Sequence, residues 1–310
     1  MPHRGINRDS EHSAVKSLSS FGALNRCRED RAGFMKLRPC IDIHDGAVKQ
    51  IVGDTIGGSV NPRTGGVRAG VTENFVSFNN ADYYARIYRK KNLPGGHIIL
   101  LNSKETEPLR YEADKMQALG ALAAYPQGMQ IGGGINPDNA ADFLNAGASH
   151  VIVTSYVFRD GKLDTKALRR IQNAAGREKL VLDLSCKRNE NGDYVVFTDR
   201  WQKPTELVIS DGTLTQLSSE CDEFLIHAAD VEGRKAGIEE PLSKLLGSWL
   251  QKMRRQGSGF EVTYAGGVHS LDDVRKLKEA SGGELDFTVG SALDLFGGSL
   301  SLDELVQTSQ

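Results

Sequence analysis

Cysteine is scarce in this sequence, and long apolar runs are missing. The four cysteines, Cys27, Cys40, Cys186 and Cys221, are widely spaced and form no C-x-x-C pair. In a chain of 310 residues this spacing predicts reduced thiols and supports neither a disulfide framework nor a zinc site. The histidines also lack metal-ligand spacing. No run approaches the roughly 18 apolar residues of a membrane helix, so we expect neither a bound metal nor a membrane span.

An excess of charge of one sign is missing as well. Lys and Arg total 38, Asp and Glu total 40, and the formal net charge is −2, with no block of like charges. The molecule as a whole should therefore not attract nucleic acid or an anionic membrane, and any binding of anions must be local. The hydrophobic content of 39% is sufficient for a sizeable core.

Residues 1–34 differ from the rest of the chain. They contain six Lys or Arg residues and several serines, with little periodic apolar pattern and no signal-peptide core. Met35 resembles a chain start directly before the first strand. We therefore divide the chain into an extension, 1–36, and a catalytic domain, 37–310. The extension is interpreted as disordered, as an artefact of gene prediction, or as a transit peptide, although its acidic residues weaken the last reading. The predicted location is cytoplasmic, or the plastid stroma if a transit peptide is present.

From residue 37 onward, short apolar runs alternate with helical patterns, which is typical of βαβ units and a parallel sheet. Strands are predicted at 39–43, 97–101, 129–131, 150–154, 180–184, 223–227, 261–264 and 286–289. Helices are predicted at 81–91, 109–122, 137–145, 165–174, 242–254 and 271–279, with a short one from 302. Eight strands is the number that closes a barrel. We therefore predict an α/β fold, a single (βα)₈ TIM barrel.

Two insertions interrupt the alternation of strands and helices. Residues 54–79 form a long stretch rich in Gly, Asn and Thr, and residues 186–201 predict a hairpin with Asn191-Gly192 at its turn. Both follow the carboxyl end of a strand, which is the catalytic face of such barrels. They are interpreted as lids over a site or, alternatively, as surface decoration.

The sequence also contains an internal duplication. Ile41-Asp42-Ile43 corresponds to Leu182-Asp183-Leu184, and two Gly-rich strand ends and two strands ending in Ser repeat in the same order, at separations of 141, 133 and 136 residues. A separation near half a barrel predicts two fused half-barrels. Their pseudo-twofold symmetry would place Asp42 and Asp183 opposite each other.

Glycine pairs at two predicted strand ends indicate phosphate binding. Gly133-Gly134 and Gly266-Gly267 each precede a helix start, where backbone N–H groups can approach an anion that a Cβ would obstruct. Additional donors are predicted at Thr154, Ser155, Gly290 and Ser291. The alternative for each pair is a tight turn that needs positive φ.

Asp42 and Asp183 are the predicted acid/base pair. Each is flanked by apolar residues within a strand, where a carboxylate is seldom found unless it is paired or functional. The alternative is a buried Asp satisfied by backbone amides or by a lysine. His44, Asp230 and Trp201 are weaker candidates for substrate contact, with a loop or anchoring role as the alternative. His227, at the end of a predicted strand, is interpreted as a core histidine.

Taken together, these motifs resemble the ProFAR (BBM II) isomerase family of histidine biosynthesis, from about residue 37 to about 300. The matching segments are RPCIDIH at 38–44, GGGIN at 132–136, LDLSC at 182–186, AGGV at 265–268 and VGS at 289–291. The resemblance implies an aldose–ketose isomerase that converts a bisphosphorylated aminoaldose to an aminoketose without metal or cofactor. It also implies that Asp42 is the base and Asp183 the acid.

The chain departs from the bacterial pattern of this family in its fifth predicted strand. Lys187 lies four residues after Asp183, so a register fixed by the basic residues would place Ser185 in the acid position. We retain Asp183, because the repeat aligns it with Asp42 and only a carboxyl can exchange a proton. Arg200 stands where a Gly would precede Trp201. Two alternative functions are the cyclase subunit of the same pathway and a non-catalytic phosphate-binding barrel. The predicted partner is a small molecule only, and the chain is expected to be a monomer.

Overall fold

A computed structural model describes residues 34–51, 73–199, 201–231 and 237–309. All eight predicted parallel strands are present, with bounds within two residues of those predicted. They are β1 (Cys40–His44), β4 (Gly96–Leu100), β5 (Met129–Gly132), β6 (Val151–Val153), β9 (Leu180–Asp183), β13 (Glu223–His227), β14 (Glu261–Ala265) and β15 (Asp286–Phe287). They lie in one sheet in the order β15-β14-β13-β9-β6-β5-β4-β1, and consecutive strands are parallel.

The sheet curls, and the two ends of the parallel series meet. The backbone N–H of Arg38, just before β1, donates to the Phe287 carbonyl of β15 at 2.8 Å. The Phe287 N–H in turn donates to the Lys36 carbonyl at 3.0 Å. Met35 and Leu37 are already part of the hydrophobic core. The described chain is therefore integrated into the fold from its first residues.

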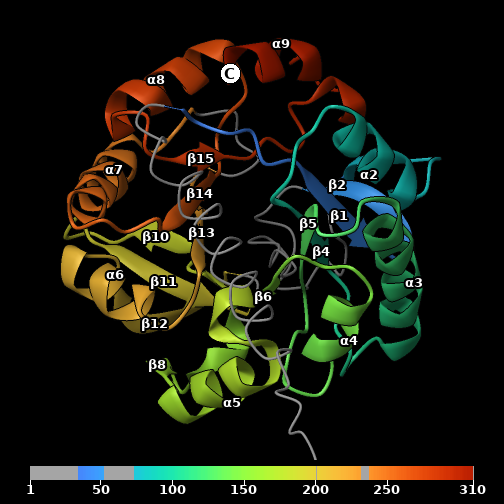
Figure 1. The fold of residues 1–310 in the computed structure, drawn as a ribbon, viewed down its shortest axis with the longest axis horizontal. Helices are drawn as coiled ribbons and strands as arrows, with labels where there is room; N and C mark the ends of the chain where they lie inside the picture. The colour runs from blue at the N-terminus through green and yellow to red at the C-terminus, as the bar shows by residue number, and fades with distance from the viewer. Residues whose placement is uncertain (1–33, 52–72, 200, 232–236, 310) are drawn as a thin grey trace, which may run out of the picture.

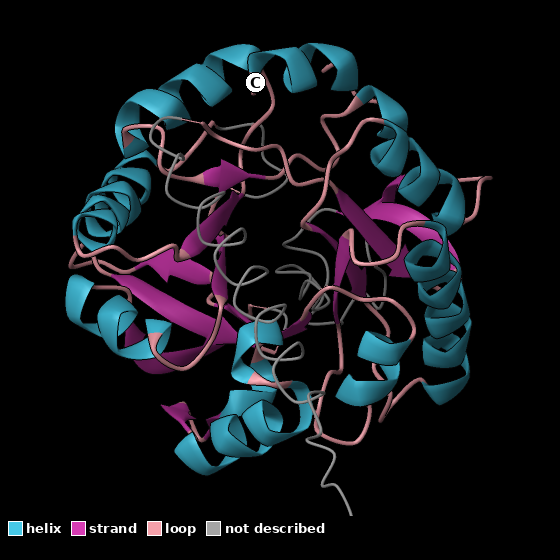
Figure 2. Ribbon diagram, viewed as in Figure 1, coloured by secondary structure: helices cyan, strands magenta, loops and turns pink. Residues whose placement is uncertain are grey.

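The helices lie outside the curled sheet (Figures 1 and 2). They are α2 (Ala81–Lys90), α3 (Pro108–Ala124), α4 (Ala140–Asn145), α5 (Thr165–Ala175), α6 (Asp211–Ser218), α7 (Glu240–Arg255), α8 (Leu271–Ser281) and α9 (Leu302–Thr308), with short 3₁₀ turns at Ser155–Val157, Arg177–Lys179 and Asp294–Phe296. The sequence analysis does not predict α6, whose buried apolar residues are only Leu214 and Leu217. Among the described residues, no helix is long and apolar enough to span a membrane.

The hairpin predicted at 186–201 is present, but it is part of a larger element. Strands β10 (Cys186–Arg188) and β11 (Tyr194–Thr198) pair antiparallel, and the turn between them contains Gly192 with φ of +89°. A third strand, β12 (Lys203–Val208), pairs with β11 and was not predicted. A two-stranded ribbon of β7 (Phe158–Arg159) and β8 (Lys162–Leu163) was also not predicted.

The insertion predicted at 54–79 lies mostly outside the described residues. Its described end contains β3 (Glu73–Val76), which pairs antiparallel with β2 (Ala47–Ile51), and β2 pairs in turn with β1. The sheet therefore extends beyond its parallel part by two strands that the sequence analysis does not predict. Arg200 and the extension up to residue 33 also lie outside the described residues.

A buried ionic cluster occupies the amino ends of the parallel strands. The Arg38 guanidinium contacts Glu223, Glu261 and Asp286, which are the first residues of β13, β14 and β15. Its nitrogens lie 2.9 Å from Glu223 and 2.7 Å from Asp286. Gln130 also donates to Glu223, at 2.8 Å. Because the polar atoms of these side chains pair with one another, the cluster connects β5, β13, β14 and β15 to the segment before β1. In α/β barrels, residues at this end of the strands commonly serve stability.

Candidate active site

A cavity of about 560 Å³ opens at the carboxyl ends of the parallel strands. In α/β barrels, catalytic residues gather at the carboxyl ends of the strands. Eleven of the thirteen predicted site residues line this cavity, namely Asp42, Asp183, Gly133, Gly134, Thr154, Ser155, Gly266, Gly267, Gly290, Ser291 and Trp201. The fold therefore brings together residues that are up to 249 positions apart in the sequence.

The other two candidates, His44 and Asp230, are not among the residues that line the cavity. His44 ends β1, and its Nδ1 lies 3.2 Å from an oxygen of Asp45. The Asp230 carboxylate accepts a hydrogen bond from the backbone N–H of Arg188 at 2.7 Å. That bond holds β10 against the loop after β13. This bond gives Asp230 a structural contact, and substrate contact by His44 and Asp230 stays a prediction.

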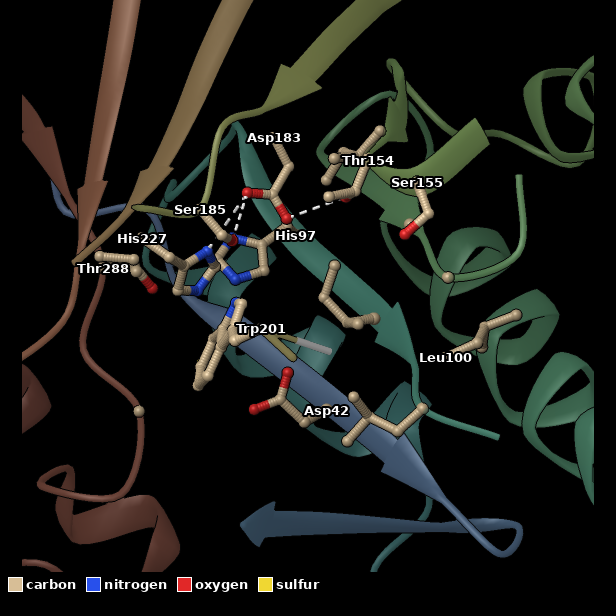
Figure 3. A pocket seen from close by; sticks show the side chains of 18 of the residues that line it. Asp42, His97, Leu100, Thr154, Ser155, Asp183, Ser185, Trp201, His227 and Thr288 are labelled. Atoms are coloured by element: carbon tan, nitrogen blue, oxygen red, sulfur yellow. Dashed lines mark hydrogen bonds and ion pairs between the residues drawn. The ribbon is translucent and has the colours of Figure 1, made fainter. Parts of the chain in front are cut away.

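Asp183 is the last residue of β9, and three neighbouring side chains surround its carboxylate (Figure 3). The Thr154 hydroxyl donates to Oδ2 at 3.0 Å, and the Ser185 hydroxyl donates to Oδ1 at 2.7 Å. Nδ1 of His227 lies 3.7 Å from Oδ1. Burial by itself would raise the pKa of Asp183, but His227 and the two hydroxyls outweigh it and hold this pKa below its ordinary value. The ionised form of Asp183 is therefore favoured in the free protein.

Asp42 lies in β1 between Ile41 and Ile43, whose side chains are fully buried. Alternation along the strand turns Asp42 in the opposite direction, into the cavity. The Gln50 side-chain amide approaches one of its oxygens at 3.4 Å. In Figure 3, Asp42 and Asp183 lie on opposite sides of the Trp201 ring. The two carboxylates thus face one cavity from different strands.

The two glycine pairs occupy equivalent positions. Gly133 follows β5 directly and Gly266 follows β14 directly, and all four glycines have positive φ, between +67° and +116°. A Cβ on Gly133 would lie 2.1 Å from the Leu100 carbonyl oxygen, and one on Gly267 would lie 1.9 Å from the Gly237 carbonyl oxygen. These contacts alone require glycine at both positions. A tight turn is therefore enough to explain the glycines, and phosphate binding stays a prediction for both pairs.

The insertion with strands β10, β11 and β12 contributes Trp201 to the cavity. Its φ of +64° is uncommon for a residue with a large side chain. Its ring centroid lies 5.8 Å from that of His227. Two residues earlier, the Asp199 backbone N–H donates to the Ser155 hydroxyl at 3.1 Å. The insertion therefore lies against the same wall of the cavity as the predicted phosphate-binding residue Ser155.

The sequence analysis assigned no site role to several residues of the cavity, among them His97, His227, Gln50 and Thr288. His97 is almost completely buried, and burial together with His227 lowers its pKa to about 3. It is therefore neutral at physiological pH. The only sequence signal for the two histidines is their place in strands that also carry apolar residues, which is equally typical of core histidines. Gln50 belongs to β2, a strand that was not predicted.

Metal-ligating side chains are not clustered in the part of the chain that the structure describes. No group of three or more His, Cys, Asp or Glu residues there lies in an arrangement that could hold a metal ion. The described side chains of the cavity include carboxylates, imidazoles and hydroxyls, which can transfer protons and form hydrogen bonds.

Comparisons with known proteins show which proteins this chain resembles. A family model described as "Histidine biosynthesis protein" matches residues 36–300. A chloroplastic protein of Medicago truncatula is 45% identical over 278 residues, which cover 88% of this chain and 81% of the relative. A protein of Yarrowia lipolytica is 45% identical over 85% of this chain and 93% of its own length. Both relatives are named 1-(5-phosphoribosyl)-5-((5-phosphoribosylamino)methylideneamino)imidazole-4-carboxamide isomerase.

Proposed function

Because the chain belongs to the family of histidine biosynthesis proteins, we propose that it catalyses the isomerisation for which its curated relatives are named. The substrate is the aminoaldose ProFAR, which carries a phosphate on each of two ribose units, and the product is the aminoketose PRFAR. The enzyme is thus an intramolecular aldose–ketose isomerase.

One observation of the structure supports this function most strongly. Asp42 and Asp183 line a single cavity whose walls also carry two equivalent glycine turns. A bisphosphorylated substrate needs two anion sites, and an aldose–ketose conversion needs a proton donor and a proton acceptor near the same sugar. We assign one phosphate to Gly133, Gly134, Thr154 and Ser155, and the other to Gly266, Gly267, Gly290 and Ser291. The flat heterocycle stacks on Trp201.

The chemistry uses proton transfers alone, so no metal or organic cofactor is required. Asp183 protonates the ring oxygen of the reacting ribose, and the ring opens as a Schiff base. Asp42 then removes the proton from the adjacent carbon, and the resulting enolamine tautomerises to the ketone. Asp183 must carry a proton at the first step although its ionised form is favoured in the free protein. Substrate phosphates and the exclusion of water both raise the pKa of a buried carboxyl.

The proposed scaffold is a closed (βα)₈ barrel made of two duplicated half-barrels. The backbone hydrogen bonds between Phe287 and the segment before β1 support closure. The equivalent positions of Gly133 and Gly266, each directly after a strand, support the duplication. In such a scaffold the two phosphate sites are related by the pseudo-twofold axis, and the two carboxylates act between them.

We propose the partners, the domain bounds and the cellular location from the composition of the chain and from the name of one relative. We propose that the chain acts as a monomer. Its formal net charge of −2 favours a small-molecule partner over nucleic acid or an anionic membrane. The catalytic domain is residues 37–310. We propose a cytoplasmic location, or the plastid stroma if residues 1–34 act as a transit peptide. The name of the Medicago relative, which is chloroplastic, supports the plastid alternative.

Genetic complementation separates the isomerase from the cyclase alternative. We expect the full chain to restore growth without histidine to a bacterial strain that lacks only the isomerase. A strain that lacks only the cyclase should stay auxotrophic. Rescue of the second strain but not of the first would favour the cyclase, and rescue of neither by well-expressed protein would favour the non-catalytic barrel. The isomerase names of the relatives favour the first outcome.

A further inference from the structure

Asp183 and His227 lie side by side at the ends of two adjacent parallel strands. Asp183 pairs in register with Leu225 of β13, so His227 stands two residues nearer the mouth of the cavity on the same side of the strand. Nδ1 of His227 lies 3.7 Å from Oδ1 of Asp183, which is within ion-pair distance. The side chains of both residues are largely buried, at 17% and 15% exposed. A charge on either one is therefore poorly screened by solvent and strongly affects the other.

Among the described residues, two aromatic rings and one alanine also lie next to His227. His97 of β4 meets the ring edge to face, with centroids 6.4 Å apart, and is itself neutral. Trp201 lies against the ring with centroids 5.8 Å apart. On the β14 side the register partner is Ala265, which has no titratable group. Asp42 also lines the cavity, but in Figure 3 it lies beyond the Trp201 ring.

We propose that His227 is a positioning residue that shares one proton with Asp183 and so keeps that carboxyl able to act as the acid. This rests on the proposed function. In this proposal Asp183 is ionised in the free protein, and the shared proton then belongs to the His227 imidazole. When substrate covers the cavity and water leaves, a pair without net charge separation is favoured. The two atoms then close from 3.7 Å to hydrogen-bond distance. The proton moves from Nδ1 of His227 to Oδ1 of Asp183, which leaves a neutral imidazole and a neutral carboxylic acid.

The proton balance closes over one turnover. Asp183 gives its proton to the ribose ring oxygen, and Asp42 takes one proton from the adjacent carbon. As the enolamine becomes the ketone, Asp42 returns its proton to the carbon of the former Schiff base. Asp183 recovers a proton from the hydroxyl that becomes the ketone, and then returns it to His227. No oxidant, reductant or further reactant is needed.

The pH dependence of kcat in the variant His227→Asn tests this sharing. Asn keeps an N–H near the position of Nδ1 but cannot exchange a proton, so Asp183 must hold its proton alone. We expect the loss relative to wild type to be about tenfold larger at pH 8 than at pH 6, which corresponds to a shift of one pKa unit. The matched control is His150→Asn, which removes a His–Asp pair outside the cavity (3.2 Å from Asp222) and should leave the profile unchanged. An equal loss at every pH would assign His227 a purely structural role and overturn the proposal.

A second measurement does not depend on turnover. An NMR titration of the His227 imidazole in the full chain should show its pKa falling by about one unit or more in Asp183→Asn, because the neighbouring charge is gone. An unchanged pKa would overturn the proposal even if the wild-type protein is an active isomerase. If instead the wild type is inactive on the aminoaldose while the titration behaves as expected, the proposed function fails and the proton-sharing pair stands.

Discussion

Asp42 and Asp183 are the two carboxylates of the cavity that the proposed function uses as its base and its acid. We expect Asp42→Asn and Asp183→Asn each to lower kcat by roughly 10² or more, because general acid or base roles contribute about 10²–10⁴. Asn preserves the shape and can still hydrogen-bond, so substrate affinity should change little. Steady-state kinetics of the purified variants would measure both quantities.

Ser185→Ala is the matched control for these substitutions. Its hydroxyl donates to Asp183 at 2.7 Å, so its loss should disturb the carboxylate only indirectly and reduce kcat much less. The structure gives Ser185 a place beside Asp183, and both residues line the cavity. If Asp183→Asn were nearly as active as wild type while Ser185→Ala was inactive, the predicted register of this strand would be wrong by two residues. Asp183 would then have no role in the mechanism.

His97 affects stability in a way that depends on pH. Its pKa is lowered to about 3 by burial and by His227, so the folded protein binds no proton there between about pH 6.5 and 3, whereas the unfolded chain does. Stability should therefore be greatest above about pH 6.5 and fall as the pH decreases. From pH 7 to pH 5 the His97 contribution amounts to roughly 2 kcal/mol, at about 1.4 kcal/mol per pKa unit.

Urea denaturation at these two pH values measures this contribution. In His97→Asn, the fall in the free energy of unfolding between pH 7 and pH 5 should be smaller than in wild type by about that amount. An identical fall in both proteins would show that His97 titrates normally in the folded state. Because the rings of His97 and His227 are neighbours, such a result would also contradict the premise that a neutral His97 lies beside His227.

At the scale of elements, the insertion with β10, β11 and β12 carries Trp201 into the cavity. If the ring stacks on the flat heterocycle, Trp201→Ala should raise KM by about 2- to 10-fold, because aromatic stacking contributes about 0.5–1.5 kcal/mol beyond burial. Trp201→Phe should retain most of the affinity. A KM that is unchanged in Trp201→Ala would assign this side chain to anchoring the loop.

The sequence predicted the parallel strands well, because each is a short apolar run between helical patterns. It did not predict β2, β3 and β12. These antiparallel strands depend on pairing with β1 and β11, partners that local patterns do not reveal. The helix α6 was missed because two buried leucines do not make a recognisable apolar stripe.

The candidate site was predictable where the repeat provided a second copy to compare. Asp42, Asp183 and the glycine pairs all line the cavity. His97 and His227 have no such partner in the other half, and a histidine in a strand has the same pattern whether it faces a core or a substrate. Asp230 was predicted to contact substrate or to be a loop residue, and the sequence gives no sign that its carboxylate accepts the backbone N–H of Arg188.

For the whole molecule, the proposed duplication predicts two anion sites of similar construction. In a crystal grown with a bisphosphorylated product analogue, one phosphate should lie near Gly134 and Ser155 and the other near Gly267 and Ser291. Ser155→Ala and Ser291→Ala should each weaken binding. Occupancy of a single site would count against a bisphosphate substrate, whatever the activity of the protein on smaller sugars.

The most direct test of the proposed isomerase is to incubate the purified full chain with the aminoaldose and follow its conversion. We expect the aminoketose to form in buffer without added metal, cofactor or protein partner, and we expect the double variant Asp42→Asn/Asp183→Asn to form essentially none. If the folded wild-type protein leaves the aminoaldose unchanged, or if the double variant converts it at the wild-type rate, the proposed reaction of this cavity is contradicted.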